Sequence, residues 1–152
     1  MPHINKLIDF TVVAYIAREG RVLMVFHKKL EKWLPLGGHI EPDEDPDQAL
    51  LREIKEESGL EDIEILGTKP ELSALGTKFL YAPAFMDIHD ISEGHRHVGL
   101  IYFARLRSGD PRLSQSEHNE IRWFSASDLG DARYNLLPSI KFYAAQALRQ
   151  VR

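Results

Sequence analysis

The sequence contains no cysteine. This absence excludes disulfide bonds, thiolate metal sites and cysteine nucleophiles, and it is typical of proteins from a reducing compartment. No apolar run approaches the roughly 18 residues that are needed to cross a bilayer. The first residues, Met1 to Lys6, are polar and lack the apolar stretch of a secretory signal. We therefore expect a soluble, cytoplasmic protein that does not associate with membranes.

An excess of positive charge is also missing. Lysine and arginine number 19 and aspartate and glutamate 23, which gives a formal net charge of -4. Proteins that bind nucleic-acid polymers usually present a basic face, so no such partner is expected. A small phosphorylated ligand is compatible with this charge, because bound metal ions can supply positive charge locally.

Internal repeats, low-complexity tracts and linkers are absent from the 152 residues. A chain of this length fits one domain, and we predict a single domain over residues 1–152. Apolar runs typical of strands occupy residues 10–17, 22–27, 63–66, 79–88, 98–106 and 121–124. The polar residues 90–96 separate two of these runs, and an amphipathic helix is predicted from about Pro138. Strands flanked by two helices indicate an α/β/α sandwich with a mixed sheet.

The other predicted helix has clear signals at both ends. Asp45 is a suitable N-cap, Pro46 suits the first helical position, and Gln48 completes the spacing of a capping box. Gly59 can adopt the left-handed conformation that ends a helix. The sequence therefore predicts a helix over residues 46–58.

This helix carries three carboxylates, Glu53, Glu56 and Glu57. At about 100° per residue they fall within one arc, beside an apolar arc that includes Leu51 and Ile54. Like charges at these spacings destabilise a helix by about 0.2–0.5 kcal/mol per pair. One interpretation is a solvated acidic face. The other is a site for Mg²⁺ or Mn²⁺, whose charge would remove the repulsion and which prefer hard oxygen ligands.

Two glycines precede the helix and favour the second interpretation. Gly37 and Gly38 permit a close approach of the backbone, and they can offer N–H groups to a phosphate. His39 follows directly and is a candidate for contact with a diphosphate, although a neutral cleft histidine is the more ordinary role. We predict Gly37, Gly38 and His39 as substrate-binding residues.

These glycines and carboxylates are part of a longer sequence pattern. Gly38 is followed by five residues, Glu44, seven residues, and then the run REIKEESGL that ends at Leu60. This pattern resembles the complete Nudix box, and every defining position of the box is filled. The order of the predicted elements is also similar to the fold of this MutT-like family.

The resemblance implies a hydrolase that cleaves a diphosphate bond with Mg²⁺ or Mn²⁺ as cofactor. The expected substrate is a nucleoside diphosphate linked to another group, or a nucleoside triphosphate. Carried over by position, Glu53, Glu56 and Glu57 would hold the metal, and Arg52 would orient these carboxylates. Glu44 would brace the loop against the helix. A homodimer is compatible with the resemblance, because dimers are common in the family.

The general base stays open between two regions. Within the box, Glu53 is the candidate. In the polar residues 114–120, Glu117 and Glu120 are candidates, and Glu120 directly precedes a predicted strand. We predict Glu53, Arg52, Glu57 and Glu120 as catalytic residues. The alternative for Glu117 and Glu120 is that each is an ordinary exposed glutamate of a loop.

A second group of residues contains histidine. His95 and His97 alternate, so on an extended strand both side chains would project from one face. Together with His89 they are candidates for binding phosphate or a metal, whereas neutral surface or cleft histidines are more common.

Two other functions compete with hydrolysis. A diphosphate isomerase on the same fold would in its familiar form need a cysteine, which the chain lacks. A non-catalytic nucleotide sensor built on this fold usually loses box carboxylates, whereas this chain keeps all of them. Residues 75–78 show neither the proline nor the tyrosine that marks some family branches, so the resemblance indicates no particular nucleotide.

Overall fold

The computed structural model describes residues 3–113 and 118–151. Within these residues eight strands form one sheet. The strands are β1 (Ile8–Arg18), β2 (Arg21–His27), β3 (Lys32–Leu34), β4 (Leu36–His39), β5 (Ile63–Leu66), β6 (Phe85–Ser92), β7 (His95–Leu106) and β8 (His118–Ser125). The helices are α1 (Pro46–Ser58), α2 (Ala126–Leu129), α3 (Pro138–Gln150) and the short 3-10 helix η1 (Ala132–Tyr134).

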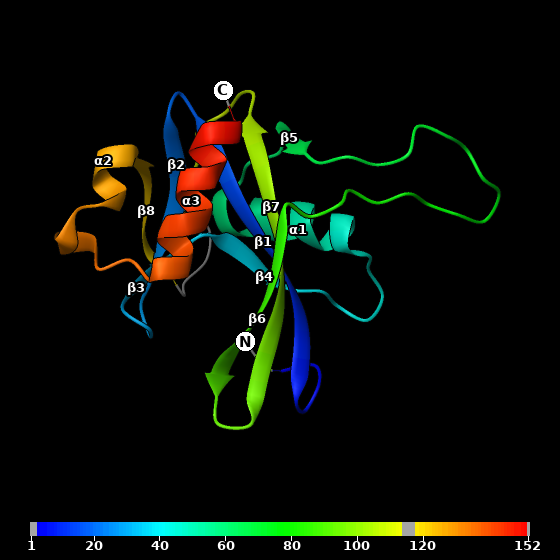
Figure 1. Cartoon of the computed structure of the whole chain (residues 1–152), viewed down its shortest axis with the longest axis horizontal. Helices are drawn as coiled ribbons and strands as arrows, with labels where there is room; N and C mark the ends of the chain where they lie inside the picture. Colours follow the sequence, from blue (N-terminus) through cyan, green and yellow to red (C-terminus); the bar gives the residue numbers. More distant parts are fainter. Residues whose placement is uncertain (1–2, 114–117, 152) are drawn as a thin grey trace.

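The sheet is mixed because one central pair of strands is parallel (Figure 1). β1 runs parallel to β7, with Asp9 opposite His97 and Ala17 opposite Arg105. The neighbouring pairs are antiparallel, and the strand order along the main path is β3-β2-β1-β7-β5. β4 pairs with β1, β6 pairs with β7, and β8 pairs with β2. The predicted mixed sheet is confirmed.

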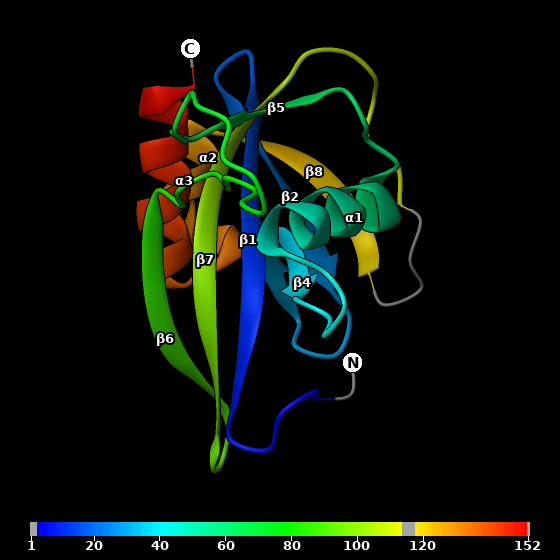
Figure 2. The same ribbon diagram turned by 90° about the vertical axis from the view of Figure 1, so that its right-hand side faces the viewer.

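Helices cover both faces of this sheet, as Figure 2 shows for α1 on one side and α3 on the other. Alternating side chains along β2 supply both layers. Leu23 and Val25 pack in the cluster that contains Leu50 and Ile54 of α1. Val22 and Met24 pack in the second cluster, with α3. The predicted α/β/α sandwich is therefore confirmed as well.

The bounds of α1 agree with the signals in the sequence. The Asp45 side chain accepts a hydrogen bond from the Gln48 N–H, and the Asp45 N–H donates to the Gln48 side chain, both at 2.9 Å. Gly59 has φ 75° and its N–H donates to the Lys55 carbonyl. These caps fix the rotation and length of the helix, and thereby the direction in which its carboxylates point.

The buried face of α1 differs from the predicted one. Leu51 is exposed, whereas Glu53 and Glu57 are only 1% and 4% exposed and lie within the buried arc. The arc contains them because it faces the backbone of Gly37 and Gly38, where no side chain fills the space. A solvated acidic face therefore describes Glu56 but not the other two carboxylates.

The hairpin of β6 and β7 also departs from the prediction. β6 begins at Phe85 rather than at residue 79, and Pro83, which cannot donate to a neighbouring strand, lies in the segment before it. Residues 90–96 were predicted to separate two strands, but Asp90 pairs with Arg96 and the strands continue to a turn at Gly94. This part of β6 is exposed, so it needs no apolar run.

Four short elements, β3, β4, α2 and η1, were not predicted. β4 is the most important for the site, although its sequence LGGH carries no strand pattern. It pairs with the middle of β1, with Val12 opposite Gly38 and Val13 opposite Gly37. Among the helices of the described residues, none is long and apolar enough to cross a membrane.

We predict that Asp45→Ala lowers the free energy of unfolding by about 1 kcal/mol, the usual cost of losing an N-cap. The substitution removes the acceptor for the Gln48 N–H at the start of α1. Urea unfolding of the metal-free protein measures the change. Asp43→Ala, at an exposed position in the same loop, is the control and should alter stability by less than about 0.5 kcal/mol. Equal effects of the two substitutions would contradict the importance of this cap.

Candidate active site

The two glycines of β4 allow the backbone to lie directly against α1. A Cβ atom at Gly38 would lie 2.3 Å from Oε1 of Glu53. A Cβ atom at Gly37, where φ is 155°, would lie 2.1 Å from the carbonyl oxygen of Val12. The Gly37 N–H donates a hydrogen bond to Oε1 of Glu57 at 2.7 Å. Gly38 therefore leaves room for the Glu53 carboxylate, and Gly37 allows β4 to lie against Val12 of β1.

The guanidinium of Arg52 connects the loop, the strand and the helix. Its Nε and Nη2 donate to the two carboxylate oxygens of Glu44 at 2.9 and 2.6 Å. Its Nη1 donates to Glu53 at 2.9 Å and to Glu56 at 3.1 Å. Its Nη2 also donates to the carbonyl of His39 at 3.0 Å. Arg52 thus fixes two carboxylates of the helix relative to the loop that precedes it.

The pKa values of the charged residues in this arrangement are shifted, some upward and one downward. The hydrogen bonds with Glu44 are the main reason that the pKa of Arg52 lies above its ordinary value. The same contact holds the pKa of Glu44 below its ordinary value. Burial raises the pKa of Glu53 to about 7, although the hydrogen bond from Arg52 acts in the opposite direction. Charge on Glu53 is therefore costly in the absence of a further cation.

The remaining carboxylates occupy different environments. Glu57 is buried between the Gly37 N–H and His118, whose Nε2 lies 3.4 Å from Oε2 of Glu57. The side chain of Glu56 is 48% exposed. We call Glu53, Glu56 and Glu57 the carboxylate cluster. Arg52 holds the first two, and the backbone of β4 holds the third. Two buried carboxylates and an exposed one form a donor set that hard divalent cations prefer.

A cavity of about 880 Å³ opens beside this cluster. Glu53, Glu57, Gly37 and Gly38 line it, together with His39. Its volume falls in the range of about 300–1,000 Å³ that is usual for small-molecule sites. The predicted glycines and two of the predicted carboxylates thus face a space of the size that a nucleotide needs.

His39 lines this cavity, and its ring also contacts Asp9 and His97, which the sequence did not indicate. It is buried, and its Nε2 lies 3.2 Å from Oδ2 of Asp9 and 3.3 Å from Nε2 of His97. The ring therefore contacts the N-terminal part of β1 and the start of β7. The His39 carbonyl accepts a hydrogen bond from Arg52 and so links β4 to the box residues.

Glu120 does not join the carboxylate cluster. It is exposed on β8 opposite Phe26, whose side chain packs in the α3 layer. Paired residues project to the same face of a sheet, so Glu120 points away from α1. Glu117, the other loop candidate, lies outside the described residues.

His118 lies beside Glu57, a contact that the sequence did not indicate. An irregularity in the pairing between Phe26 and His27 places His118 opposite His27, on the face of α1. Asp9 and His3 were missed as well, since they lie far along the chain from the histidines that they contact. No local spacing signals either arrangement.

Comparison with known proteins agrees with this geometry. The family model described as NUDIX domain matches residues 7–146. The chain is 31% identical over 103 residues to the CTP pyrophosphohydrolase of Escherichia coli (strain K12), a match that covers 64% of this chain and 76% of that protein.

Solved structures are similar over almost the whole chain. A NUDIX-family hydrolase from Clostridium perfringens has a TM-score of 0.81 and 33% identity, and the match covers 96% of this chain and 98% of that one. A MutT NUDIX hydrolase from Burkholderia pseudomallei has a TM-score of 0.67 and 26% identity, over 95% and 98% of the two chains. The chain therefore belongs to the Nudix family and is an enzyme that acts on phosphorus-containing anhydrides.

Proposed function

We propose that the protein hydrolyses a pyrophosphate bond of a nucleotide with Mg²⁺ or Mn²⁺ held by Glu53, Glu56 and Glu57. The observation that carries this proposal is the carboxylate cluster itself, fixed by Arg52 beside a cavity of about 880 Å³. The buried, acidic donor set is difficult to explain as a stabilising feature, because like charges at this spacing repel.

Each part of the site has a separate task in this proposal. When bound, the cation neutralises the diphosphate, lowers the pKa of the attacking water and stabilises the leaving oxygen. Arg52 positions Glu53 and Glu56, and Glu44 braces Arg52 from the loop. The backbone of Gly37 holds Glu57 through its N–H.

For the general base we propose Glu53 rather than Glu120. Glu53 lines the cavity, whereas Glu120 projects from the opposite face of the sheet. Glu117 is the alternative that the test below includes.

The substrate class follows from the relatives. The Escherichia coli protein that is 31% identical is named a CTP pyrophosphohydrolase. We therefore propose a nucleoside triphosphate as the first substrate to test, with a nucleoside monophosphate and pyrophosphate as products. A nucleotide sensor on this fold is the second candidate, but retention of Arg52 and all box carboxylates favours hydrolysis.

We predict Mg²⁺-dependent cleavage of at least one member of a panel of nucleoside triphosphates, nucleotide sugars and dinucleotides. Glu57→Gln should abolish this activity, and Glu53→Gln should reduce kcat by about 100-fold or more. Chromatographic identification of the products gives the bond that is broken. Glu117→Gln and Glu120→Gln should retain activity if Glu53 is the base.

Glu61→Gln is the matched control, because Glu61 lies just beyond the box, is exposed and pairs with Lys55. It should leave kcat unchanged. An untouched panel, with tight binding of one nucleotide, would contradict hydrolysis and support the sensor function.

We further predict that Glu53→Gln stabilises the metal-free protein at high pH. A carboxyl group whose pKa is raised from 4.5 to about 7 on folding destabilises the folded state. This penalty is absent below pH 4.5, grows as the pH rises through this range, and is complete above pH 7. Removing the charge should therefore raise the free energy of unfolding by about 1–3 kcal/mol at pH 8, and by much less near pH 4.5.

Urea unfolding in the presence of a chelator measures both values. The parent protein, measured at the same two pH values, is the reference. An equal loss of stability at both pH values in Glu53→Gln would indicate a purely structural carboxylate.

A further inference from the structure

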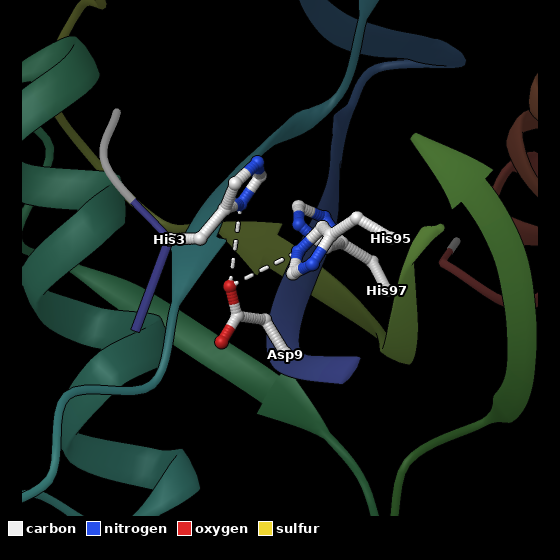
Figure 3. A group of neighbouring side chains, drawn as sticks. All are labelled: His3, Asp9, His95 and His97. Carbon is white, nitrogen blue, oxygen red and sulfur yellow. Dashed lines mark ion pairs between the residues drawn. The ribbon is translucent and has the colours of Figure 1, made fainter. Parts of the chain in front are cut away.

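A second group of potential ligands lies around the beginnings of β1 and β7 (Figure 3). It contains His3, Asp9, His95 and His97, and one ligand atom from each lies within 4.8 Å of the others. The parallel pairing of β1 and β7 creates this group, because it places Asp9 opposite His97. We call these four residues the His/Asp cluster.

Asp9 is the centre of the cluster and is fully buried. Its Oδ1 accepts a hydrogen bond from the Asn5 N–H at 2.6 Å, and its Oδ2 accepts one from the Ile4 N–H at 3.2 Å. Burial alone would raise the pKa of Asp9, but these donors and the nearby His39 and His95 hold it below its ordinary value. Asp9 is therefore an ionised carboxylate in a fixed orientation.

His95 provides the most specific observation. Its Nδ1 lies 3.0 Å from the carbonyl of Lys6, which can only accept a hydrogen bond, so Nδ1 must carry a proton. Its Nε2 is buried, has no hydrogen-bond partner, and lies 3.2 Å from Oδ2 of Asp9. In a neutral ring this places a lone pair against a carboxylate oxygen. The repulsion disappears only if a proton or a metal cation lies at this nitrogen.

Further imidazole nitrogens converge on the same point. His3 Nδ1 lies 3.4 Å from Oδ2 of Asp9, and His39 Nε2 lies 3.2 Å from it. Burial, together with nearby histidines, lowers the pKa of His97 to about 4. One carboxylate cannot compensate the charge of several protonated rings at such distances. A single divalent cation bound by several imidazole nitrogens would balance this carboxylate, and the neutral imidazole is the form in which histidine binds metals.

We propose that the His/Asp cluster is a second metal site, which binds one divalent transition-metal ion such as Zn²⁺. Three imidazoles and one carboxylate suit zinc and similar ions, in contrast to the all-oxygen carboxylate cluster, which suits Mg²⁺. The Lys6 carbonyl at Nδ1 of His95 is the kind of partner that orients metal-binding histidines. This site goes beyond the proposed hydrolysis and does not depend on it.

The position of the site indicates a structural task. It would fasten the segment before β1 to β1 and β7, through His3 on one side and His95 and His97 on the other. It also adjoins His39, whose ring contacts Asp9 and His97 and whose carbonyl contacts Arg52. A metal here would hold the strand residue that follows Gly38, at the border of the cavity that His97 lines together with Glu53 and Glu57.

The test is titration of the chelator-treated protein with Co²⁺, followed by visible absorption. A four-coordinate site of nitrogen and oxygen ligands gives intense bands, whereas six-coordinate Co²⁺ in an all-oxygen site gives weak ones. We expect intense bands that saturate at one equivalent and are displaced by Zn²⁺. His95→Gln and Asp9→Asn should weaken binding by at least about tenfold.

Two controls separate this site from other histidines and from the carboxylate cluster. His27→Gln removes a histidine outside the His/Asp cluster and should leave the titration unchanged. Glu57→Gln should also leave the bands unchanged, although it abolishes hydrolysis in the proposal above. Bands that are lost in Glu57→Gln but kept in His95→Gln would overturn the second site and leave the hydrolytic one intact.

Asp9→Asn also disturbs the turn that Ile4 and Asn5 form, so a second variant is needed. His97→Gln removes a half-buried ligand that lies outside this turn, and its circular dichroism should match the parent protein. We expect the same weakening of Co²⁺ binding, and a rise in Tm with Zn²⁺ only in the parent protein. The absence of intense bands in the parent protein, or binding in His95→Gln and His97→Gln that equals binding in the parent protein, would overturn the second site.

Discussion

The hydrogen bonds of the Arg52 guanidinium are the constraint on which the site depends. One planar group joins Glu44 of the loop, the carbonyl of His39 on β4, and Glu53 and Glu56 of α1. Its fixed fork geometry matches the two oxygens of Glu44, which a lysine could not do. Loss of this group would leave a buried carboxylate without its compensating charge, a change that typically costs about 3–5 kcal/mol.

The site also shows how local instability is tolerated by the rest of the fold. Glu53 and Glu57 occupy positions on α1 that would ordinarily carry apolar side chains. On either side of them, Leu50 and Ile54 pack into a core formed by the central strands. That core and the caps of α1 stabilise the helix, so the carboxylates can remain buried and close together without unfolding it.

Much of this arrangement could be predicted because its signals are local. Asp45, Gln48 and Gly59 determine the ends of α1 through hydrogen bonds within a few residues, and the predicted bounds are confirmed. The mixed sheet follows from apolar runs whose β-branched residues favour strands. The box residues were likewise predictable as a group, since a single helix and its preceding loop bring them together.

The rest depends on contacts between distant segments. β4 has no strand pattern, because two of its four residues are glycines, Gly37 against Val12 of β1 and Gly38 against Glu53 of α1. The position of His118 depends on an irregularity in the pairing of β2 with β8, whereas Glu120 faces away from the site through its regular pairing with Phe26. The alternation of His95 and His97 indicated part of the His/Asp cluster, but only the parallel pairing of β1 with β7 brings Asp9 beside them.

The central claim is that the carboxylate cluster binds the divalent cation. Crystals grown with Mn²⁺ and examined by anomalous diffraction at the manganese edge test it most directly. The account predicts a peak among the carboxylate oxygens of Glu53, Glu56 and Glu57, and no such peak in crystals of Glu57→Gln. A cluster that contains no anomalous peak at saturating Mn²⁺, with Arg52 still bonded to Glu53 and Glu56, would contradict it.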